Sequence, residues 1–194
     1  MTWQEIKDNY AADPGVRHLL AVECTGGSNA RVRYYEKQDG RWWLLHRGTA
    51  FIGKNGLGKT REGDAKTPEG DLRPVAAFGI KPNPGCTLPY IDLTPGTVAC
   101  DAEGPFYNRI VKPADYFESA GPELQGEQMW LLSPEYDYGL QTDFNPANEY
   151  PLGSAIFIHC KGAKTWTGGC VALDKRMMRQ ILKTAGDGLV ISIH

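Results

Sequence analysis

The sequence GSAIFIHCKGAKTWTGGCVALDKRMM, residues 153–178, contains the pattern that decides the fold. An apolar strand is predicted over 154–160, where SAIFIHC is almost free of polar side chains. A glycine-containing loop follows, and the apolar tripeptide VAL then leads into a helix predicted over 175–185. We expect the chain to run out along the strand and return through the loop, so that the two ends of the loop lie close together.

The predicted helix is the clearest element of the sequence. Asp174 stands immediately before it as a candidate N-cap, and Gly186 follows it as a candidate C-terminal stop. Four apolar side chains recur at helical spacing and predict the face that packs on the core. They are Met177, Met178, Ile181 and Leu182.

The rest of the chain predicts short strands joined by turns, because 23 Gly and 13 Pro punctuate it frequently. Asp39-Gly40 is a strong signal for a two-residue β-hairpin. Thr2, with Glu5 three residues later, indicates a short capped helix. The fold class expected is therefore mostly β with one or two short helices. Strands other than 154–160 are expected over 18–24, 31–38, 41–53, 75–80, 129–133, 138–144 and 189–193, and an irregular section over 81–128.

The composition is that of an ordinary globular protein. Of the 194 residues, 41% are hydrophobic and 23% are charged, and the formal net charge is −2. Nothing here favours nucleic acid or an anionic membrane as a partner, and the length suits one domain over 1–194. No apolar run reaches the roughly 18 residues of a membrane span. The first ten residues, MTWQEIKDNY, lack the basic start and apolar centre of a secretion signal.

The stretch GKNGLGKT, residues 53–60, matches the phosphate-binding pattern G-x-x-x-x-G-K-[ST] at every specified position. That loop requires a following helix, because the helix N-terminus holds the anion. The next segment, REGDAKTPEGDLRP, contains several glycines and prolines, and proline in a helix interior costs about 3 kcal/mol. We therefore expect a turn-rich loop that binds no nucleotide, and no cofactor is expected elsewhere.

His159 and Cys170 stand at the two ends of the glycine-containing loop and suggest a catalytic pair. A cysteine nucleophile needs a base, because a free thiol has a pKa of about 8.5, and a nearby histidine supplies one. It also needs backbone N–H groups for the oxyanion, and Gly168-Gly169 leave those groups uncovered by side chains. From the spacing alone, a buried inert cysteine beside a structural histidine is an equally good interpretation.

The other cysteines leave two alternatives open. A zinc site formed by His159, Cys160 and Cys170 fits no common zinc spacing, and strand alternation places Cys160 on the opposite face from His159. We therefore expect no metal. Cys86 and Cys100 would suit a disulfide in an exported protein, and two free thiols are an equally good expectation.

The loop also carries a family resemblance. His159, a loop and then Thr167-Gly168-Gly169-Cys170 resemble the signature of the L,D-transpeptidases, the cysteine transpeptidases of bacterial cell walls. Further motifs are similar to that family in the same order, so that the resemblance covers about 50–193. They are Gly63, Asp64, Thr67, Pro68 and Gly70 in a G-D-x-x-T-P-x-G run, then Phe78 and Gly79, then Tyr107, Asn108 and Arg109, and finally the strand GSAIFIHC.

The resemblance implies a single β-sandwich-like catalytic domain that acts on peptidoglycan stem peptides, with 1–49 contributing an N-terminal helix and strands. The nucleophile would attack the carbonyl of the third stem residue, a diamino acid, and expel the terminal D-alanine. The thioester would then pass to an amine of a neighbouring stem and form a cross-link, and carbapenems would acylate the same sulfur. A hydrolase that uses water as acceptor and a non-catalytic wall-binding domain are the alternatives.

The resemblance also implies roles for single residues. Cys170 would be the nucleophile and His159 its base and the acid for the leaving amine. The N–H groups of Gly169 and Cys170, with that of Gly168, would bind the oxyanion, and Thr167 would orient His159 or the loop. Three residues would bind substrate, with Arg109 suited to a carboxylate. These are Tyr107, Asn108 and Arg109.

The sequence departs from the family pattern at two positions. Gly168 stands where many members have a second histidine, and Ala172 stands where many have Asn or Arg. The sequence therefore does not identify the group that binds the substrate carboxylate, the acyl acceptor or the oligomeric state. Because the family works on the wall, we expect an extracytoplasmic location, with any signal or anchor outside this sequence.

Overall fold

The computed structural model describes residues 2–117 and 124–194, and it is mostly β, as predicted. The helices are α1 (Trp3–Asn9), α2 (Pro113–Phe117) and α3 (Lys175–Thr184), with a 3-10 turn, η1, at Met129–Leu131. The first strands are β1 (His18–Gly26), β2 (Asn29–Gln38), β3 (Arg41–Phe51), β4 (Gly70–Leu72), β5 (Pro74–Gly79), β6 (Tyr90–Asp92) and β7 (Val98–Cys100). The later strands are β8 (Ile110–Val111), β9 (Gly126–Gln128), β10 (Gly139–Thr142), β11 (Phe157–Cys160), β12 (Val171–Leu173) and β13 (Leu189–Ile193).

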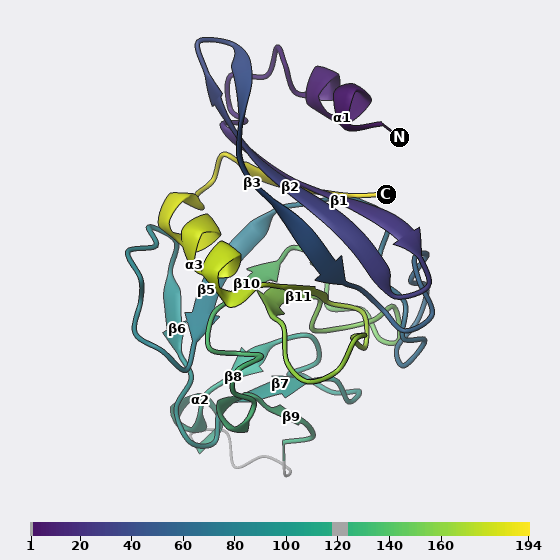
Figure 1. Cartoon of the computed structure of the whole chain (residues 1–194). Helices are drawn as coiled ribbons and strands as arrows, with labels where there is room; N and C mark the ends of the chain where they lie inside the picture. The colour runs from purple at the N-terminus through teal and green to yellow at the C-terminus, as the bar shows by residue number, and fades with distance from the viewer. Residues whose placement is uncertain (1, 118–123) are drawn as a thin grey trace.

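One large sheet joins the two ends of the chain. Its strand order is β4-β13-β1-β2-β3-β12-β11-β10-β5-β6. The C-terminal strand β13 lies parallel to β1, with His18 opposite Leu189, and β3 reaches β12 through Phe51 and Ala172. Figure 1 shows β1, β2 and β3 as a long twisted panel above the shorter strands β5, β10 and β11. The N-terminal strands are therefore central to the sheet.

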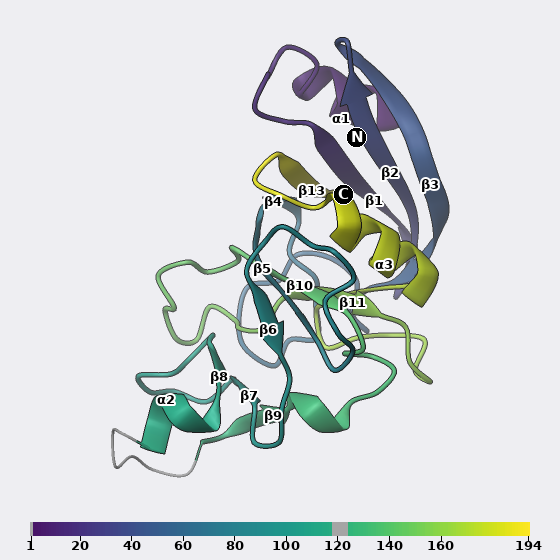
Figure 2. The same ribbon diagram turned by 90° about the vertical axis from the view of Figure 1, so that its left-hand side faces the viewer.

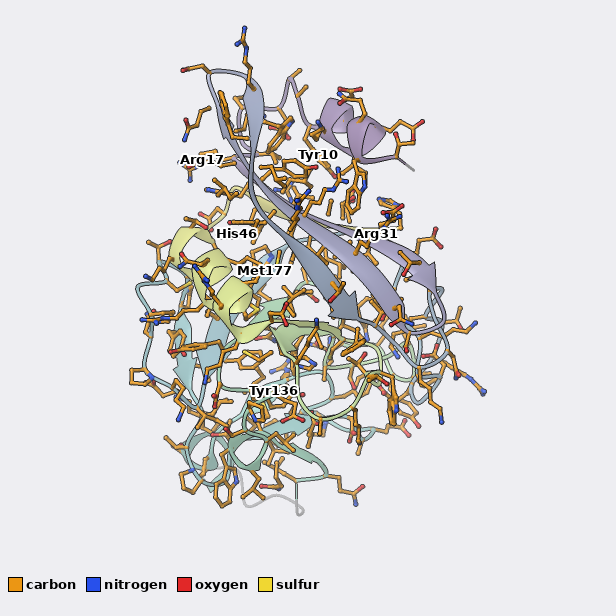
Figure 3. The ribbon with its side chains drawn as sticks, viewed as in Figure 1. Tyr10, Arg17, Arg31, His46, Tyr136 and Met177 are labelled. Carbon is orange, nitrogen blue, oxygen red and sulfur yellow. The ribbon has the colours of Figure 1, made fainter. Side chains whose placement is uncertain are left out.

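The core lies between the two parts of this sheet, and α3 fills the space between them. Buried side chains of β1 and β2 share one cluster with those of β10, β11 and α3. Met177 of α3 lies 3.8 Å from the position that a Cβ would take on Gly48 of β3, and Figure 3 shows it under the upper strands. The four apolar residues predicted for the packed face of this helix are all buried. Their burial explains why the helix forms here.

Most local predictions are confirmed. Asp39-Gly40 turns the β2–β3 hairpin with φ of 49° and 72°, which a primed turn requires. Thr2 and Glu5 form a complete capping box at α1. Asp174 precedes α3, but its side chain caps no N–H and instead pairs with Lys161 at 3.3 Å. The strand predicted over 129–133 is wrong, because these residues form η1.

The section predicted as irregular, 81–128, contains short elements that the sequence did not indicate. Strands β8, β7 and β9 form a separate three-stranded sheet, and α2 follows β8. Figure 2 shows this small sheet at the lower end of the molecule, away from β1–β3. Its strands of two or three residues are too short to show a period in the sequence. No helix among the described residues is long and apolar enough to cross a membrane.

Candidate active site

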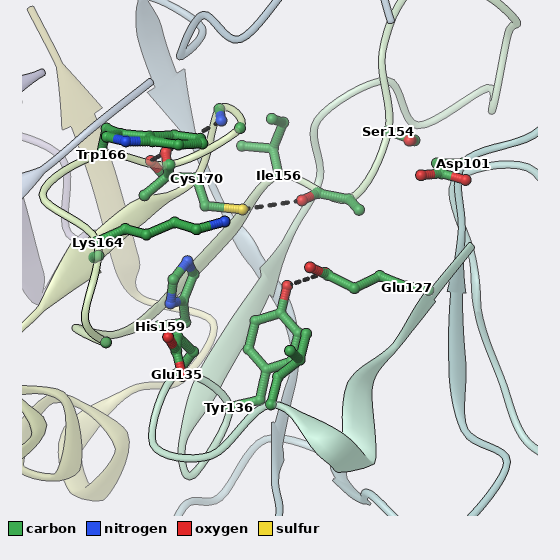
Figure 4. Close-up of a pocket in the computed structure, with 18 of the residues that line it drawn as sticks. Asp101, Glu127, Glu135, Tyr136, Ser154, Ile156, His159, Lys164, Trp166 and Cys170 are labelled. Carbon is green, nitrogen blue, oxygen red and sulfur yellow. Dashed lines mark hydrogen bonds between the residues drawn. The ribbon is translucent and has the colours of Figure 1, made fainter. Parts of the chain in front are cut away.

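The pairing of β11 with β12 brings the predicted catalytic residues together. The strands are parallel, with His159 opposite Ala172 and Ile158 opposite Val171. Cys170 immediately precedes β12 and therefore lies beside Phe157. Because side chains alternate across a strand, residues 157 and 159 share one face, and Cys170 shares it with them. Figure 4 shows the side chains of Cys170 and His159 directed into the same cavity.

The sulfur of Cys170 is held by two hydrogen bonds to the neighbouring chain. It accepts from the N–H of Phe157 at 3.3 Å and donates to the carbonyl of Ala155 at 3.1 Å. Ala155 has a φ of 51°, a conformation that costs free energy for a residue with a Cβ. The thiol proton therefore points to the Ala155 carbonyl.

His159 is oriented by its backbone and by a tyrosine ring. Its Nδ1 lies 2.8 Å from the carbonyl oxygen of Cys160, and a carbonyl only accepts, so Nδ1 carries the proton. Its Nε2 is then the acceptor that a general base requires. The ring of Tyr136 meets the imidazole edge to face, with centroids 5.3 Å apart.

Burial favours the neutral forms of both catalytic candidates. It raises the pKa of Cys170 to about 12, although the Phe157 N–H lowers it. Burial also lowers the pKa of His159 below its ordinary value, although the Cys160 carbonyl opposes this shift. A cysteine nucleophile with a lowered pKa would rest as a thiolate. This structure instead favours a neutral thiol beside a neutral imidazole.

Thr167 orients the loop rather than the imidazole. Its hydroxyl accepts from the N–H of Gly169 at 3.1 Å and donates to the carbonyl of Cys170 at 2.7 Å. Gly169 has a φ of 152°, and a Cβ there would lie 2.8 Å from the carbonyl oxygen of Lys66. Only glycine fits this position. Gly168, in contrast, is exposed and has nothing within 4 Å of an added Cβ.

A cavity of about 300 Å³ opens beside the sulfur, a size found in small-molecule sites. All five predicted catalytic residues line it, together with charged and aromatic side chains that the sequence did not indicate. The predicted catalytic residues are His159, Thr167, Gly168, Gly169 and Cys170. The additional residues include Lys59, Glu62, Asp101, Glu127, Glu135, Tyr136, Ser154, Lys164 and Trp166.

The three predicted substrate-binding residues lie outside this lining. Arg109 is exposed, and Tyr107 is buried with its hydroxyl donating to Glu62 at 2.6 Å. Asn108 donates its amide to two carbonyls and to a side chain of the segment 144–148. Its Oδ1 accepts from the N–H of Ala155 at 3.0 Å. Asn108 therefore holds the backbone of Ala155, the residue whose carbonyl accepts from the thiol.

Lys59, the lysine of the apparent phosphate loop, also faces the cavity. No helix follows it, as predicted. Its side chain is 2% exposed and pairs with Asp64 at 3.0 Å. Burial alone would raise the pKa of Asp64, but N–H groups of Thr60, Lys66 and Arg61 and the Lys59 ammonium hold it well below its usual range. The glycine run thus builds a charged wall of the cavity.

A second pair that sequence reasoning missed lies opposite the nucleophile. The Tyr136 hydroxyl donates to the Glu127 carboxylate in a short hydrogen bond, and Figure 4 shows this pair pointing into the cavity. Burial raises the pKa of Tyr136 well above its ordinary value. The two residues come from opposite sides of η1, where the sequence predicted a strand, so no local pattern indicated them.

The remaining cysteines take no part in the site. Cys160 belongs to the main core and donates to the Tyr138 carbonyl at 3.5 Å, so it points away from His159 as strand alternation predicted. Cys86 and Cys100 are both free thiols, packed in different clusters. Of the two alternatives for this pair, the structure contains free thiols.

Comparison with known proteins agrees with this architecture. The model of the YkuD family, the L,D-transpeptidase catalytic domain, matches residues 27–193. Because the match extends over most of the chain, the protein belongs to the L,D-transpeptidase catalytic-domain family. The match begins before β2 and so includes two strands that the sequence motifs did not reach. No curated protein sequence matches the chain at a significant level.

Solved structures are similar only at low identity. Bd1075 from Bdellovibrio bacteriovorus is 15% identical with a TM-score of 0.49, and the alignment covers 92% of this chain and 48% of that one. The helical cell shape determining protein Pgp2 from Campylobacter jejuni is 15% identical with a TM-score of 0.47, covering 98% and 55%. The chain therefore spans about half the length of these proteins.

Proposed function

We propose that the protein is a cysteine-dependent L,D-transpeptidase that cross-links peptidoglycan stem peptides through a thioester. The observation that supports it most is the placement of Cys170 and His159 on one face of adjacent parallel strands, inside one cavity. A thiol, an acceptor nitrogen and an open glycine loop are the groups that acyl transfer needs. The family assignment supports the substrate class.

In the proposed reaction, the Cys170 sulfur forms a bond to the carbonyl carbon of the diamino acid. His159 Nε2 takes the thiol proton as that bond forms, since the resting thiol is neutral. The C–N bond to the terminal D-alanine then breaks, and His159 returns the proton to the leaving amine. An amine of a second stem attacks the thioester, the C–S bond breaks, and the thiol is restored.

The oxyanion of this reaction needs donors from the glycine loop. We assign the N–H groups of Cys170 and Gly169 to this role, with Gly168 beside them. The Gly169 N–H donates to the Thr167 hydroxyl in this structure. It must leave that hydroxyl and donate to the oxyanion when the oxyanion forms. Removing a single oxyanion donor typically lowers kcat by about 10²–10³.

A cation at the cavity rim suits the substrate carboxylate that the family pattern left open. Ala172 lines the cavity but carries no charge. Lys164 is exposed at the rim, with its ammonium 4.8 Å from the ring centroid of Trp166. We propose that Lys164 takes the carboxylate-binding role, as a point charge rather than a bidentate fork.

The experiment that tests the function uses a stem tetrapeptide and mass detection. The wild type is expected to give a cross-linked dimer, or a shortened peptide if water is the acceptor. Cys170→Ala is expected to abolish both, since no other described thiol lines the cavity. Cys24→Ser, in β1, is the matched control and should keep full activity.

Two results would contradict the proposal. Turnover that survives in Cys170→Ala would remove the thiol from the mechanism. Binding of the peptide without any product in the wild type would favour the non-catalytic wall-binding alternative.

A carbapenem adduct on Cys170 in an intact-mass measurement is a further expected outcome. An extracytoplasmic location follows from this proposal, because peptidoglycan lies outside the membrane.

A further inference from the structure

The cavity has an acidic end that the proposed acyl transfer does not use. Carboxylates of Glu62, Asp101 and Glu127 line it. Figure 4 shows Asp101 and Ser154 on the far side of the cavity from His159, with Glu127 between them. A substrate bound at the sulfur therefore extends toward a negatively charged wall.

These carboxylates destabilise one another. Asp101 and Glu127 are exposed residues, but partial burial of its carboxyl group raises the pKa of Asp101, and the charge of Glu62 raises it further. Burial also raises the pKa of Glu127, and Asp101 adds to this shift, while the Tyr136 hydrogen bond and Lys164 oppose it. A cation placed among the carboxylates would relieve this repulsion.

The cations of the cavity do not fill this role. Lys59 is committed to Asp64 at 3.0 Å, and Lys164 lies at the exposed rim beside Trp166. The Tyr107 and Tyr136 hydroxyls each donate to one carboxylate, but they carry no positive charge. Glu62 and Asp101 are therefore left as acceptors without a balancing cation among the described residues that line the cavity.

An independent observation at the same place points to a ligand. Ser154 is 6% exposed, and its Oγ has no hydrogen-bond partner among the described residues. The Ser154 hydroxyl lowers the pKa of the neighbouring Tyr107, but the two hydroxyl groups do not have the geometry of a hydrogen bond. A buried hydroxyl without a partner is costly. Ser154 lines the cavity, although its Oγ is shielded from solvent in this structure, so a rotation of the hydroxymethyl side chain lets a ligand in the cavity satisfy it.

We infer that Glu62, Asp101 and Ser154 form a subsite for a primary ammonium group of the substrate. An ammonium has three N–H donors, which match two carboxylates and one hydroxyl oxygen. The subsite selects peptides that carry an amine on a side chain over neutral analogues of the same shape. The inference rests on the proposed function only for the source of that ammonium, which is either the diamino acid of the acyl donor or the attacking amine of the acceptor.

The binding test needs no catalytic activity. The probes are Nα-acetyl-lysine amide and its Nε-acetylated form, which differ in the charged group. Protection of Cys170 from alkylation, followed by peptide mass mapping, gives the affinity of each. The wild type is expected to bind the charged probe at least about tenfold more tightly, a preference that weakens with salt because it is electrostatic.

Matched variants decide whether the acidic end is responsible. Asp101→Asn and Glu62→Gln keep the shape and remove one charge each, and either should lower the preference to about twofold or less. Glu69→Gln, an exposed change outside the cavity, should keep it. Equal affinity for the two probes in the wild type, or an unchanged preference in both variants, would overturn the inference. Circular dichroism verifies that each variant is folded.

A second arm identifies the source of the ammonium. Stem tetrapeptides with a free or acetylated side-chain amine are compared by intact mass, which separates thioester formation from transfer. Slower thioester formation with the acetylated peptide assigns the subsite to the donor. Because acetylation also removes the attacking amine, the acceptor role is tested by transfer of the thioester to an unacetylated stem, and slower transfer in Asp101→Asn and Glu62→Gln than in the wild type assigns the subsite to the acceptor. If neither step depends on the charge, the inference fails. If neither peptide forms a thioester, the proposed function fails, and the probe affinities still decide the ammonium subsite.

Discussion

Cys170 and His159 show how burial controls reactivity at the scale of single residues. Both lie in a cavity wall, at 8% and 7% exposure, and low exposure disfavours a thiolate and an imidazolium alike. Reactive cysteines with a low pKa sit in electropositive surroundings. Here burial raises the pKa of Cys170 most, and the charge of Glu127, which raises it, opposes that of Lys59, which lowers it. The pair is therefore suited to proton transfer during attack.

This neutral resting state predicts slow alkylation of Cys170. With its pKa at about 12, the thiolate fraction at pH 7 is far below that of a free cysteine. Iodoacetamide is expected to modify Cys170 at least about tenfold more slowly than free cysteine at pH 7. The rate should keep rising above pH 9, as measured by peptide mass mapping. An alkylation rate that levels off near pH 7 would instead show that Cys170 is already a thiolate at that pH.

Asn108 gives a second prediction at this scale. Replacing it with Ala leaves the N–H of Ala155 without its acceptor and releases the segment 144–148. The free energy of unfolding should fall by about 2 kcal/mol. Because Asn108 lies outside the cavity lining, kcat should fall while KM stays unchanged.

A conservative variant separates positioning from substrate binding. Asn108→Asp keeps an acceptor for the Ala155 N–H and loses the amide donors, so it should recover part of kcat. A rise in KM with kcat unchanged would instead indicate that Asn108 contacts the substrate directly, as the family resemblance implied. Steady-state kinetics on the tetrapeptide distinguish these outcomes.

At the scale of elements, the glycine loop between β11 and β12 depends on one of its two adjacent glycines. An added Cβ at Gly169 would meet Lys66 O at 2.8 Å and Ile156 Cδ1 at 2.9 Å. Gly169→Ala is therefore expected to cost about 1–3 kcal/mol in thermal or denaturant unfolding. It should also displace the oxyanion donors and lower kcat.

Gly168→Ala is the matched control for this prediction. Nothing lies within 4 Å of an added Cβ at Gly168, so the change should alter stability by less than about 0.5 kcal/mol. Equal destabilisation by the two substitutions would contradict the close approach of Gly169 to Lys66 and Ile156. The need for uncovered backbone N–H groups treats the two glycines alike, whereas the fold does not.

At the scale of the whole molecule, the order of strands makes residues 1–49 part of the main sheet. Strands β1–β3 lie between β13 and β12, and their buried side chains belong to the core that α3 closes. The N-terminal strands are thus inserted between strands of the motif-bearing region 50–193. That the chain forms one domain over 1–194 stays a prediction.

A truncation tests this prediction. Residues 50–194 alone are expected to show no cooperative unfolding transition, because β12 and β13 each lose one of their two partner strands and the core loses one wall. Removing only 1–13, which contain α1, should keep a cooperative transition at a free energy lower by about 2–3 kcal/mol, since Ile6 is fully buried. A cooperative 50–194 fragment in denaturant unfolding would show that the N-terminal strands form a separate unit.

The sequence by itself determined the elements that depend on neighbours along the chain. The hairpin at Asp39-Gly40, the capping box at Thr2 and helix α3 follow from local turn chemistry, capping and a 3.6-residue period. It also indicated His159 and Cys170 as a pair, because they stand at the two ends of one glycine-containing loop. The strand predicted at 129–133 was wrong because an apolar run cannot distinguish a strand from η1.

Only the tertiary structure decided what surrounds the pair. Lys59, Tyr136 and Glu127 reach the cavity from distant segments, and no spacing in the sequence encodes that approach. The same holds for the charged states, since burial depends on the packing of the whole chain. Turn and helix signals act over a few residues and are therefore visible in the sequence. The electric field and the shape of a cavity arise only when segments that are remote in the sequence meet.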